Sequence, residues 1–491
     1  MKLFRIRGGV HPAGRKEATR DLPIETMPLP GRLYLPVQQH IGAPAAPAVK
    51  VGERVLRGQL LAHSQGAVSA PIHAPTSATV ADIADLPAPH PSGLAVRTVV
   101  LAPDGLDEAV DRETVADPLS LSPGEIATLV GAAGIVGMGG ATFPAAVKLN
   151  LPRRQPIHTL VINGAECEPF LTCDERLMRE RGDAVIAGIR LMARALGVQR
   201  TLVAIEDNKP EARAMMVAAA AGVDDFRVLG VPTRYPMGSE KHLVQTLTGL
   251  ETPARELTAD LGVVVHNVAT AHAVYRALYH GEPCISRVVT VSGGATQRPA
   301  NLEVRLGTRV TDLLNHCGGF RETPARLLAG GPMMGQMLPH QRVPIVKGSS
   351  GILALTGAET AGRREMPCIR CGSCVEACPC GLLPLAMAAH GRAGDLEGAA
   401  RHGLMDCVSC GACAYTCPSH IPLVQIFHHA RGALAARQRV AHKAEETRHL
   451  SQRREARLAR EQAHKAAEAA ARKAAREAAN KARAAAREAA S

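Results

Sequence analysis

Apolar and polar residues alternate along this chain with a period that changes from one region to the next. Between residues 31 and 105, short β-prone runs are separated by turns rich in glycine and proline, a pattern typical of a small all-β unit. Between residues 120 and 285, apolar strand-like runs alternate with longer amphipathic stretches, which predicts an α/β domain. Ser122 followed by Pro123 is a start signal for the first helix of that domain.

Four further regions complete the expected organisation. Residues 1–30 are rich in Gly, Pro and Arg and predict an extended arm. Residues 286–345 begin with two strand-like runs that pair naturally as a hairpin, which indicates a small separate unit. Residues 360–430 combine helical stretches with eight cysteines. Residues 441–491 form a basic, Ala-rich tail that cannot bury a core, and we expect a solvated, fraying helix or disorder there.

Length and composition limit the class of protein. A chain of 491 residues is too long for a single hydrophobic core. Its apolar content of 46%, without any Trp, is sufficient for several packed domains. The N-terminus lacks the apolar segment of a signal peptide, and no uncharged apolar run reaches the roughly 18 residues of a spanning helix. We therefore expect a cytoplasmic chain that reaches a membrane through a partner or through its basic surface.

Half of the net charge of +12 lies in the tail, which carries 13 Lys or Arg and 7 Asp or Glu, a net +6. The remaining residues have an ordinary charge balance, which does not favour nucleic-acid binding by the folded domains. For the tail itself, the functional alternative to a solvated helix is binding to anionic lipid headgroups or to nucleic acid.

Two cysteine runs carry the strongest chemical signal. Both read C-x2-C-x2-C-x3-C-P, and the second follows the first by 39 residues. Iron in a cubane requires four soft thiolates, and in paired sites the fourth cysteine of each run ligates the other cluster. The predicted ligands are Cys368, Cys371, Cys374 and Cys417 for one [4Fe-4S] cluster and Cys407, Cys410, Cys413 and Cys378 for the other.

Zinc and disulfides are the alternatives for these cysteines. Zinc sites usually pair two C-x2-C knuckles, and this spacing matches them poorly. Disulfides need an oxidising compartment, and nothing in the sequence indicates export. The five other cysteines have scattered positions, so we expect them to be reduced thiols: Cys167, Cys173, Cys284, Cys317 and Cys380.

Polar residues follow the predicted strands of the α/β domain. The glycine-rich turn Gly134–Gly140 precedes a predicted helix with Lys148 in it, so its backbone, the N–H groups of that helix and the lysine could hold a phosphate. Asn163 ends a strand, and Glu166 and Glu168 follow it. Open α/β sheets bind ligands at this edge, although a solvated loop is the alternative.

The first β-rich unit resembles a known fold. Val49–Leu60, followed by Ile72–Pro75, is similar to the flattened β-barrel of biotinyl and lipoyl carrier domains, which present a lysine at a hairpin tip. The intervening stretch Ser64–Ile72 contains no lysine. We therefore expect the carrier fold, a barrel-sandwich hybrid, without the carrier chemistry.

Longer motifs carry a second resemblance. The glycine loop with its later Lys148 is followed by Asn-x-x-Glu-x-Glu-Pro from Asn163, Tyr-x-x-Gly-x-Glu from Tyr235 and Asn-Val-x-Thr from Asn267. Together they resemble the FMN- and NADH-binding flavoprotein subunit of respiratory complex I. With the β unit before them and the cysteine runs behind, the chain over about residues 5–430 resembles the C subunits of the Rnf (Rsx) family of ion-translocating oxidoreductase complexes.

That resemblance implies a Rossmann-like FMN- and NADH-binding domain, a β-grasp unit and a helical ferredoxin-like module. It implies Gly137, Gly139, Gly140 and Lys148 around the FMN phosphate or ribityl chain, and Asn163, Glu166, Glu168, Glu240, Asn267 and Thr270 beside the flavin and nicotinamide. One position departs from complex I flavoproteins, because Ala165 stands where they carry an acidic residue. FMN and NADH in this subunit are therefore hypotheses.

The expected function is electron transfer in a membrane-bound complex. The resemblance implies a peripheral subunit on the cytoplasmic side of the bacterial inner membrane, catalytic only together with integral-membrane subunits. Electrons would pass between NADH and ferredoxin or membrane carriers through the two clusters, coupled to ion translocation. Two alternatives stay open: a relay scaffold that binds no nucleotide, and a soluble NADH:ferredoxin-type oxidoreductase.

Overall fold

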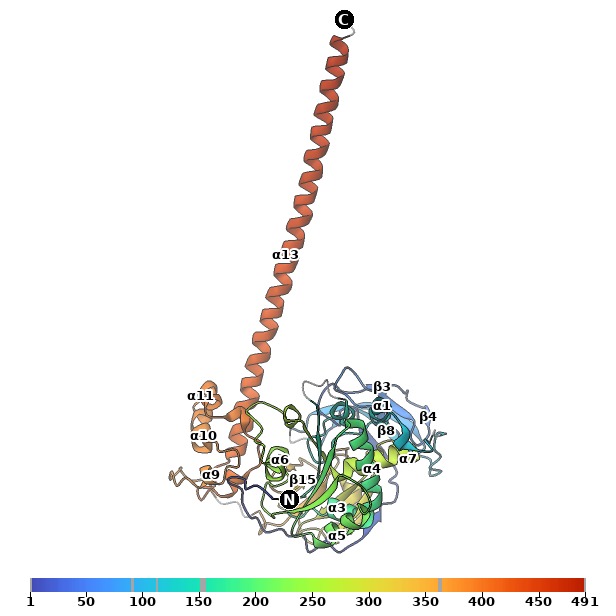
Figure 1. The fold of residues 1–491 in the computed structure, drawn as a ribbon, viewed down its shortest axis with the longest axis vertical. Coiled ribbons are helices and arrows are strands. Elements are labelled where there is room, and N and C mark those ends of the chain that lie inside the picture. Colours follow the sequence, from blue (N-terminus) through green and yellow to red (C-terminus); the bar gives the residue numbers. More distant parts are fainter. Residues whose placement is uncertain (1, 90–91, 112–113, 151–155, 361–363, 490–491) are drawn as a thin grey trace.

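The computed structural model describes residues 2–89, 92–111, 114–150, 156–360 and 364–489. It consists of a globular body from which a single long helix, α13 (Leu423–Glu488), projects (Figure 1). Two 3₁₀ turns, η1 (Pro118–Ser120) and η2 (Thr258–Leu261), lie in the body. Within the described residues, no helix combines the length and the apolar character needed to cross a membrane.

Two small antiparallel sheets form the first β-rich unit, with strand orders β2-β8-β7-β4 and β3-β5-β6. Two of the β-prone runs of this unit are not single strands: residues 48–52 form a loop and turn, and residues 55–62 are divided between two strands by a turn at Gly58 with φ +88°. The strands are β2 (Leu33–Pro36), β3 (Ala46–Pro47), β4 (Arg54–Val55), β5 (Leu60–His63), β6 (Ile72–His73), β7 (Ala78–Pro87) and β8 (Ala95–Pro103).

A four-stranded sheet of order β11-β10-β9-β12 forms the α/β domain, and all three strand pairs are parallel. Its first helix begins with the expected cap, because the side chains of Ser122 and Glu125 form a reciprocal capping box. The elements are α1 (Pro123–Ala132), α2 (Ala145–Leu149), β9 (Thr159–Gly164), α3 (Cys173–Glu180), α4 (Gly182–Leu196), β10 (Arg200–Glu206), α5 (Pro210–Ala219), β11 (Phe226–Val231), α6 (Glu240–Thr248), β12 (Val263–Asn267) and α7 (Val268–His280).

A six-stranded sheet of order β1-β14-β13-β17-β15-β16 forms the third unit. The expected hairpin is present, since β13 and β14 are antiparallel. The N-terminal arm supplies β1, which pairs in parallel with β14 from far along the chain. The elements are β1 (Ile24–Thr26), β13 (Ser286–Ser292), β14 (Ala300–Arg305), α8 (Val310–His316), β15 (Arg326–Ala329), β16 (Gln336–Met337) and β17 (Gly351–Leu355).

The cysteine-rich region is a helical module with its own apolar core, to which Met387, Leu404 and Phe427 contribute. Phe427 and Leu434 belong to the start of α13, so this helix is anchored in the module before it leaves the body. The remaining elements of the module are α9 (Ser373–Glu376), α10 (Pro384–Arg392), α11 (Leu396–Arg401), η3 (Leu404–Asp406) and α12 (Ala412–Tyr415).

The N-terminal arm connects these units. Its Val10 forms an isolated antiparallel bridge with Tyr235 of the α/β domain. The N–H of Gly9 donates to the carbonyl of Ala377 in the cysteine-rich module, at 2.9 Å. Gly8, with φ +54°, packs so closely on the backbone of Cys378 that a Cβ would lie 2.6 Å from it. The arm therefore joins the module to the α/β domain.

Candidate metal centres and cofactor site

The eight cysteines of the two runs surround two cavities. Each cavity receives three sulfurs from one run and the fourth from the other. One is lined by Cys368, Cys371, Cys374 and Cys417, and the other by Cys378, Cys407, Cys410 and Cys413. These are the two sets that the spacing predicts. Cys380, for which the sequence suggests no role, also lines the second cavity.

Both runs fold into the same short loop. In the first run Arg370 and Gly372 have φ +55° and +83°, and the one-turn helix α9 follows. This turn points the N–H of Arg370 at the sulfur of Cys368, at 3.4 Å. The second run repeats the contact, with the N–H of Ser409 donating to the sulfur of Cys407 at 3.4 Å. Such N–H donors stabilise thiolate charge, so the loops are suited to hold ligated sulfur.

The two cavities differ in their surroundings. Cys368 and Cys371 are exposed to solvent, whereas Cys410 and Cys413 are buried. The hydroxyl of Tyr235, itself buried, donates to the carbonyl of Cys410 at 2.6 Å. The second cavity thus lies against the α/β domain, and the first faces outward. Four soft sulfurs around each cavity match the ligand set of a [4Fe-4S] cluster.

Asn163, one residue before the end of β9, lies opposite Asn267, the last residue of the neighbouring strand β12. The amide of Asn163 donates to the carbonyl of Gly238 at 2.8 Å, which brings the Tyr235–Glu240 motif to this edge. The amide of Asn267 donates to the carboxylate of Asp174 at 2.6 Å. Two motifs that the sequence separates by about a hundred residues therefore meet at the carboxyl end of the sheet, where parallel sheets bind ligands.

The glycine loop lies beside this edge. A Cβ at Gly139 would lie 3.1 Å from that of Asn267, so the loop backbone approaches the strand end closely. Gly140 has φ +113° and open space where a Cβ would be, which leaves the backbone accessible on that side. The N–H of Met138 donates to the hydroxyl of Thr270 at 2.9 Å. An accessible glycine backbone next to polar strand ends is compatible with a bound FMN.

The helix after the glycine loop offers less to a bound phosphate than the sequence suggests. The N–H of Gly137 donates to the carbonyl of Phe143 at 2.8 Å, which closes the loop. Helix α2 then has only five residues, and its first N–H, that of Ala145, is taken by the carbonyl of Ile135. The expectation that this helix presents free N–H groups to a phosphate is therefore wrong for Ala145, because the turn uses that donor itself.

Lys148 lies at the end of α2 and is already paired. Its ammonium donates to the carboxylate of Glu240 and to the carbonyl of Val265, at 3.0 and 3.1 Å. Glu240 also accepts from the hydroxyl of Thr258 at 2.6 Å. The two predicted residues are thus in direct contact, and the charge of Lys148 is largely balanced within the protein.

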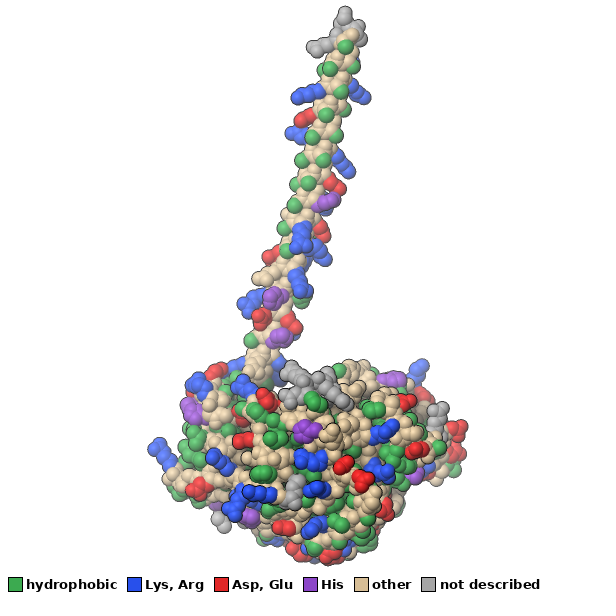
Figure 2. Space-filling view, in the orientation of Figure 1, with side chains coloured by type: hydrophobic (Ala, Val, Ile, Leu, Met, Phe, Trp, Pro, Cys, Tyr) green, Lys and Arg blue, Asp and Glu red, His purple; other side chains and the backbone are tan. Residues whose placement is uncertain are grey.

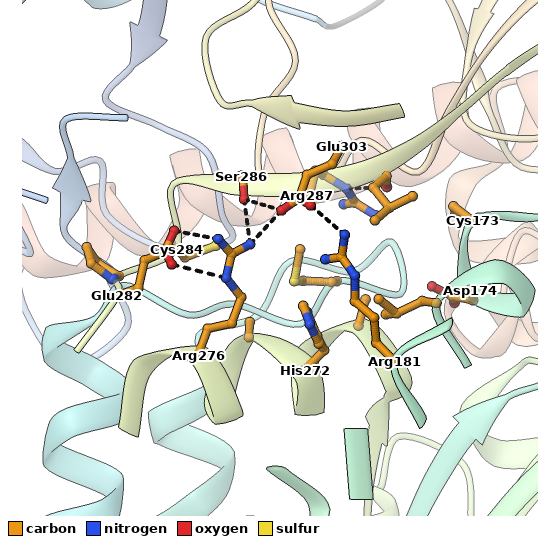
Figure 3. A pocket seen from close by; sticks show the side chains of 16 residues that line it. Cys173, Asp174, Arg181, His272, Arg276, Glu282, Cys284, Ser286, Arg287 and Glu303 are labelled. Atoms are coloured by element: carbon orange, nitrogen blue, oxygen red, sulfur yellow. Dashed lines mark hydrogen bonds and ion pairs between the residues drawn. The ribbon is translucent and has the colours of Figure 1, made fainter. Parts of the chain in front are cut away.

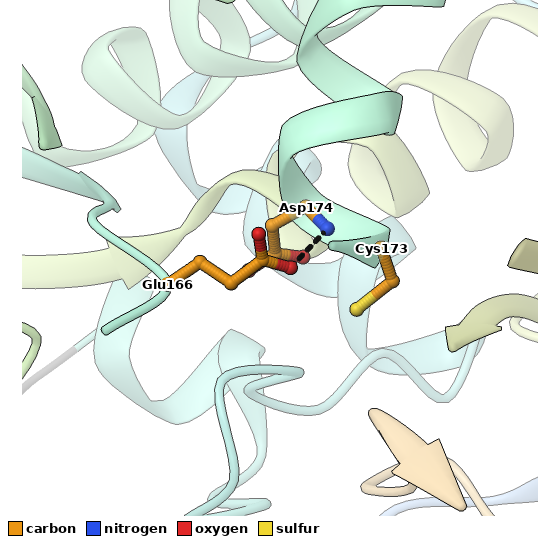
Figure 4. Close-up of side chains that lie close together, drawn as sticks. All are labelled: Glu166, Cys173 and Asp174. Atoms are coloured by element: carbon orange, nitrogen blue, oxygen red, sulfur yellow. Dashed lines mark hydrogen bonds between the residues drawn. The ribbon is translucent and has the colours of Figure 1, made fainter. Parts of the chain in front are cut away.

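Glu166 caps helix α3, since its carboxylate accepts from the N–H groups of Asp174 and Glu175 at 2.7 and 3.3 Å (Figure 4). The side chains of Glu166, Cys173 and Asp174 gather there, with their potential ligand atoms within 4.8 Å of one another. Burial, together with the nearby Glu166, raises the pKa of Asp174 to about 7. An acid that exchanges its proton near neutral pH therefore lies at the edge of the predicted flavin site.

Glu168 connects the α/β domain to the third unit. Its carboxylate accepts from the N–H groups of Met333 and Met334 at 3.0 and 2.9 Å. Burial raises the pKa of Glu168 to about 7, although these N–H donors act against the shift. A Cβ at Gly411 would lie 2.9 Å from the carbonyl of Met333, so this loop also touches the second cysteine run.

Two buried lysines, which no sequence motif singled out, support the loop that carries these acids. Lys16, from the arm, donates to the carbonyls of Glu166 and Glu168 at 2.9 and 3.1 Å, and burial lowers its pKa. Lys209 donates to the carbonyl of Ala165 at 2.8 Å. Lys209 follows strand β10, and its place at a strand end was a usable signal. Nothing around Lys16 in the sequence indicates its role.

A polar pocket lies between helix α7 and strands β13 and β14 (Figure 3). Arg276 bridges Glu282 and Glu303 at 2.5 and 2.7 Å, and Arg181 contacts Glu303 at 2.6 Å. Although burial alone would raise it, the contacts with Arg181 and Arg276 lower the pKa of Glu303 to about 2. These ion pairs hold the α/β domain to the third unit, and no sequence pattern indicates them.

Four family models match successive parts of the chain. They are the RnfC barrel sandwich hybrid domain at residues 4–106, the Nuo51 FMN-binding domain at 130–276, the SLBB domain at 288–336 and the 4Fe-4S dicluster domain at 367–421. The chain therefore contains an FMN-binding domain and a dicluster domain. Their order is the order of the units in the fold.

Known proteins with similar sequences carry consistent names. The C subunit of the ion-translocating oxidoreductase complex of Rhodobacter capsulatus is 58% identical over 443 residues, which is 90% of this chain and 85% of the relative. The C subunit of the proton-translocating ferredoxin:NAD(+) oxidoreductase complex of Clostridium ljungdahlii is 47% identical over 383 residues, 78% and 83% of the two chains.

Among solved structures, an NAD+-reducing [NiFe]-hydrogenase in its H2-reduced state aligns with a TM-score of 0.45 and 21% identity, covering 66% of this chain and 67% of that one. The sequence identity to the C subunits extends over most of both chains, and the domain order agrees with it. The chain belongs to the family of C subunits of ion-translocating oxidoreductase complexes.

Proposed function

We propose that this chain is the subunit of an ion-translocating oxidoreductase complex that exchanges electrons with NADH and passes them singly through two [4Fe-4S] clusters. One observation carries the proposal: two cavities, each lined by four cysteine sulfurs drawn from both runs, in a chain that also contains an FMN-binding domain. Bound FMN would supply the exchange between a two-electron hydride donor and one-electron acceptors.

The residues of the α/β domain hold and orient the nucleotide in this proposal. Gly139 and Gly140 present an accessible backbone beside the strand ends, and Asn163 and Asn267 place amide groups at the same edge. Glu166 and Glu168 are fixed by backbone N–H groups, so their carboxylates keep one position. Gly137, Lys148, Glu240 and Thr270 complete the set; the Lys148–Glu240 pair would have to open for Lys148 to reach a phosphate.

The finer domain assignments also belong to the proposal. We assign a Rossmann-like fold to residues 120–285, a β-grasp fold to 286–345 and a ferredoxin-like module to 360–430, with the barrel-sandwich unit at 31–105. The parallel sheet, the antiparallel β13–β14 hairpin and the separate core of the cysteine-rich module support these assignments. In the barrel-sandwich unit, residues 64–72 lack the lysine that carrier chemistry needs.

The partners follow from the same family. The relatives are named as subunits of ion-translocating complexes, and one is named for ferredoxin and NAD(+). We assign this chain to the cytoplasmic side of a bacterial inner membrane, next to integral-membrane subunits, with ferredoxin or a similar carrier as electron partner. The outward-facing cavity at Cys368 and Cys371 is the side from which such a partner can approach.

Anaerobic purification with measurement of iron, sulfide and flavin tests the proposal. We expect roughly eight irons per chain, bound flavin that bleaches with NADH, and two paramagnetic centres after reduction. Clusters without flavin would indicate a relay scaffold instead. Full activity in a soluble fraction without other subunits would indicate a soluble oxidoreductase. Zinc, or no metal, would refute the redox assignment.

A further inference from the structure

Helix α13 has a long part that no other described element of the body covers. Its first turns are anchored by Phe427 and Leu434, which are 1% and 8% exposed. From residue 436 onward, every side chain that the structure describes is exposed, up to residue 487. This projecting part is visible in Figure 1, and Figure 2 shows small apolar and long charged side chains along it. Its surface is free for a function outside the folded body.

The projecting part carries a basic residue at every eleventh position: Lys443, Arg454, Lys465, Arg476 and Arg487. Eleven residues complete three helical turns to within about 20°, so these side chains lie along one side of the helix. Arg472 and Arg483 follow Lys465 and Arg476 by seven residues, which is about two turns, and they lie on the same side. We call these seven residues the basic stripe.

The basic stripe is chemically distinct from the rest of the helix surface. It holds seven of the tail's 13 Lys and Arg residues. Glu477 lies away from the stripe, whereas Glu461, seven residues after Arg454, and Glu468, four residues before Arg472, lie on the same side of the helix as the seven basic residues. Within the described part of the chain, Arg472, Arg476 and Arg483 form no ion pair, whereas Glu468 is 3.7 Å from His464. Arg472, Arg476 and Arg483 therefore keep their charge available to an anionic partner.

The other faces of the projecting part do not provide a seam for a second copy. Its large apolar residues are Val440, Leu450 and Leu458, which are 70%, 65% and 42% exposed. Coiled coils need large apolar residues at two positions of every seven-residue repeat, whereas the tail has alanine at 20 of its 51 positions and few large apolar residues. The same lack of large side chains prevents deep insertion into a bilayer, because alanine buries little area.

The stripe drifts by only about 80° around the helix from Lys443 to Arg487, and this nearly straight course selects the shape of the partner. From Lys443 to Arg487 it extends for about 66 Å, at about 1.5 Å per residue. A DNA phosphate backbone turns fully around its axis in about 34 Å, so a straight row of charges would follow it for only part of its length. A bilayer surface is flat over the whole distance and presents anionic phosphates throughout.

We propose that the basic stripe of α13 docks lengthwise on an anionic lipid bilayer, with its Lys and Arg side chains among the headgroups and the helix lying on the surface. In this proposal α13 contacts the lipid directly, in addition to any membrane attachment that the partner subunits provide. Because the start of α13 is packed in the cysteine-rich module, this docking also fixes the module relative to the membrane.

Two full-length variants with the same change in charge test the proposal. The stripe variant replaces Lys465, Arg472, Arg476, Arg483 and Arg487 with Gln, and the control variant replaces Arg453, Arg457, Arg460, Lys473 and Lys481 with Gln. Gln keeps a high helix propensity, so both tails stay helical by circular dichroism. Binding is measured by co-sedimentation with phosphatidylcholine vesicles, with and without phosphatidylglycerol, at low and high salt.

The unaltered chain is expected to bind only the vesicles with phosphatidylglycerol and to dissociate at high salt. The stripe variant should lose at least about tenfold in partitioning, and the control variant a clearly smaller factor. Equal losses in both variants, or equal binding to neutral vesicles, would overturn the proposal. So would tighter binding to duplex DNA than to vesicles, or dimers in analytical ultracentrifugation that only the stripe variant loses. Iron and flavin contents, measured in parallel, stay unchanged and report separately on the redox function.

Discussion

The two cysteine-lined cavities have the same sequence motif and the same loop geometry, yet their environments differ. Cys368 and Cys371 lie at the outer rim of the cysteine-rich module and are exposed. Cys410 is buried against the body and receives a hydrogen bond on its carbonyl from Tyr235. Burial and hydrogen bonding change cluster potentials, so equal motifs are expected to give unequal centres. The inner cavity is placed to exchange electrons with the α/β domain, and the outer one with a partner.

The largest expected effect tests which cysteines belong to which cavity. Cys378→Ser should remove the inner cluster and leave the outer one, because Cys378 of the first run lines the cavity of the second. Iron should fall from roughly eight to roughly four per chain, and one paramagnetic centre should remain after reduction. The matched control is Cys380→Ser, which also changes a sulfur at the inner cavity and should keep both centres. If Cys380→Ser loses the inner cluster and Cys378→Ser keeps it, then Cys380 and not Cys378 is the fourth ligand of that cluster.

A second comparison uses equivalent glycines of the two runs. Gly411 has φ +81° and a Cβ there would lie 2.9 Å from the carbonyl of Met333, whereas Gly372 has φ +83° and open space. Both alanine variants carry backbone strain of about 1–2 kcal/mol, and Gly411→Ala adds a steric clash, for a total of about 3–4 kcal/mol. Thermal denaturation of the anaerobic protein measures both. Equal losses of stability in Gly411→Ala and Gly372→Ala would mean that the second cysteine run is not packed on the body.

Glu168 gives the inner side a dependence on pH. Its pKa is raised by burial to about 7, so the folded state holds a proton that the unfolded state loses at lower pH. The associated stability, on the order of 3 kcal/mol, is complete below the unfolded pKa near 4.5 and is lost as pH rises through about 7. In Glu168→Gln this loss should be smaller, as measured by denaturant unfolding between about pH 5 and pH 8. An unchanged pH profile would count against the assignment of this proton to Glu168.

The smallest expected effect concerns Tyr235. Tyr235→Phe removes the hydroxyl that donates to Cys410 and leaves a buried carbonyl without that donor, at a cost of about 1–2 kcal/mol. The paramagnetic signal of the inner centre should shift, while that of the outer centre should not. Redox titration followed by EPR distinguishes the two centres. A shift of both signals would show that the cavities are coupled more closely than their surroundings suggest.

Much of the local structure could be predicted from the sequence. The Ser122–Glu125 capping box and the two repeated cysteine loops depend on residues close together in the chain. The parallel sheet follows from the alternation of strand-like and helical stretches. The register that places Asn163 opposite Asn267 joins residues about a hundred positions apart, and the tertiary structure decided it. The local pattern did not indicate that the N–H of Ala145 at the start of α2 donates to Ile135, because the glycine loop sets that bond by folding back on itself.

The spacing of the cysteines determined by itself which sulfurs can converge, since a C-x2-C-x2-C loop leaves little conformational freedom and the fourth ligand must come from elsewhere. Only the tertiary structure decided which cavity faces the body. That choice depends on Tyr235 and Met333, whose contacts with Cys410 and Gly411 join residues far apart in the chain. Such contacts form because packing brings buried polar groups together and each must find a partner, and no local pattern encodes that pairing.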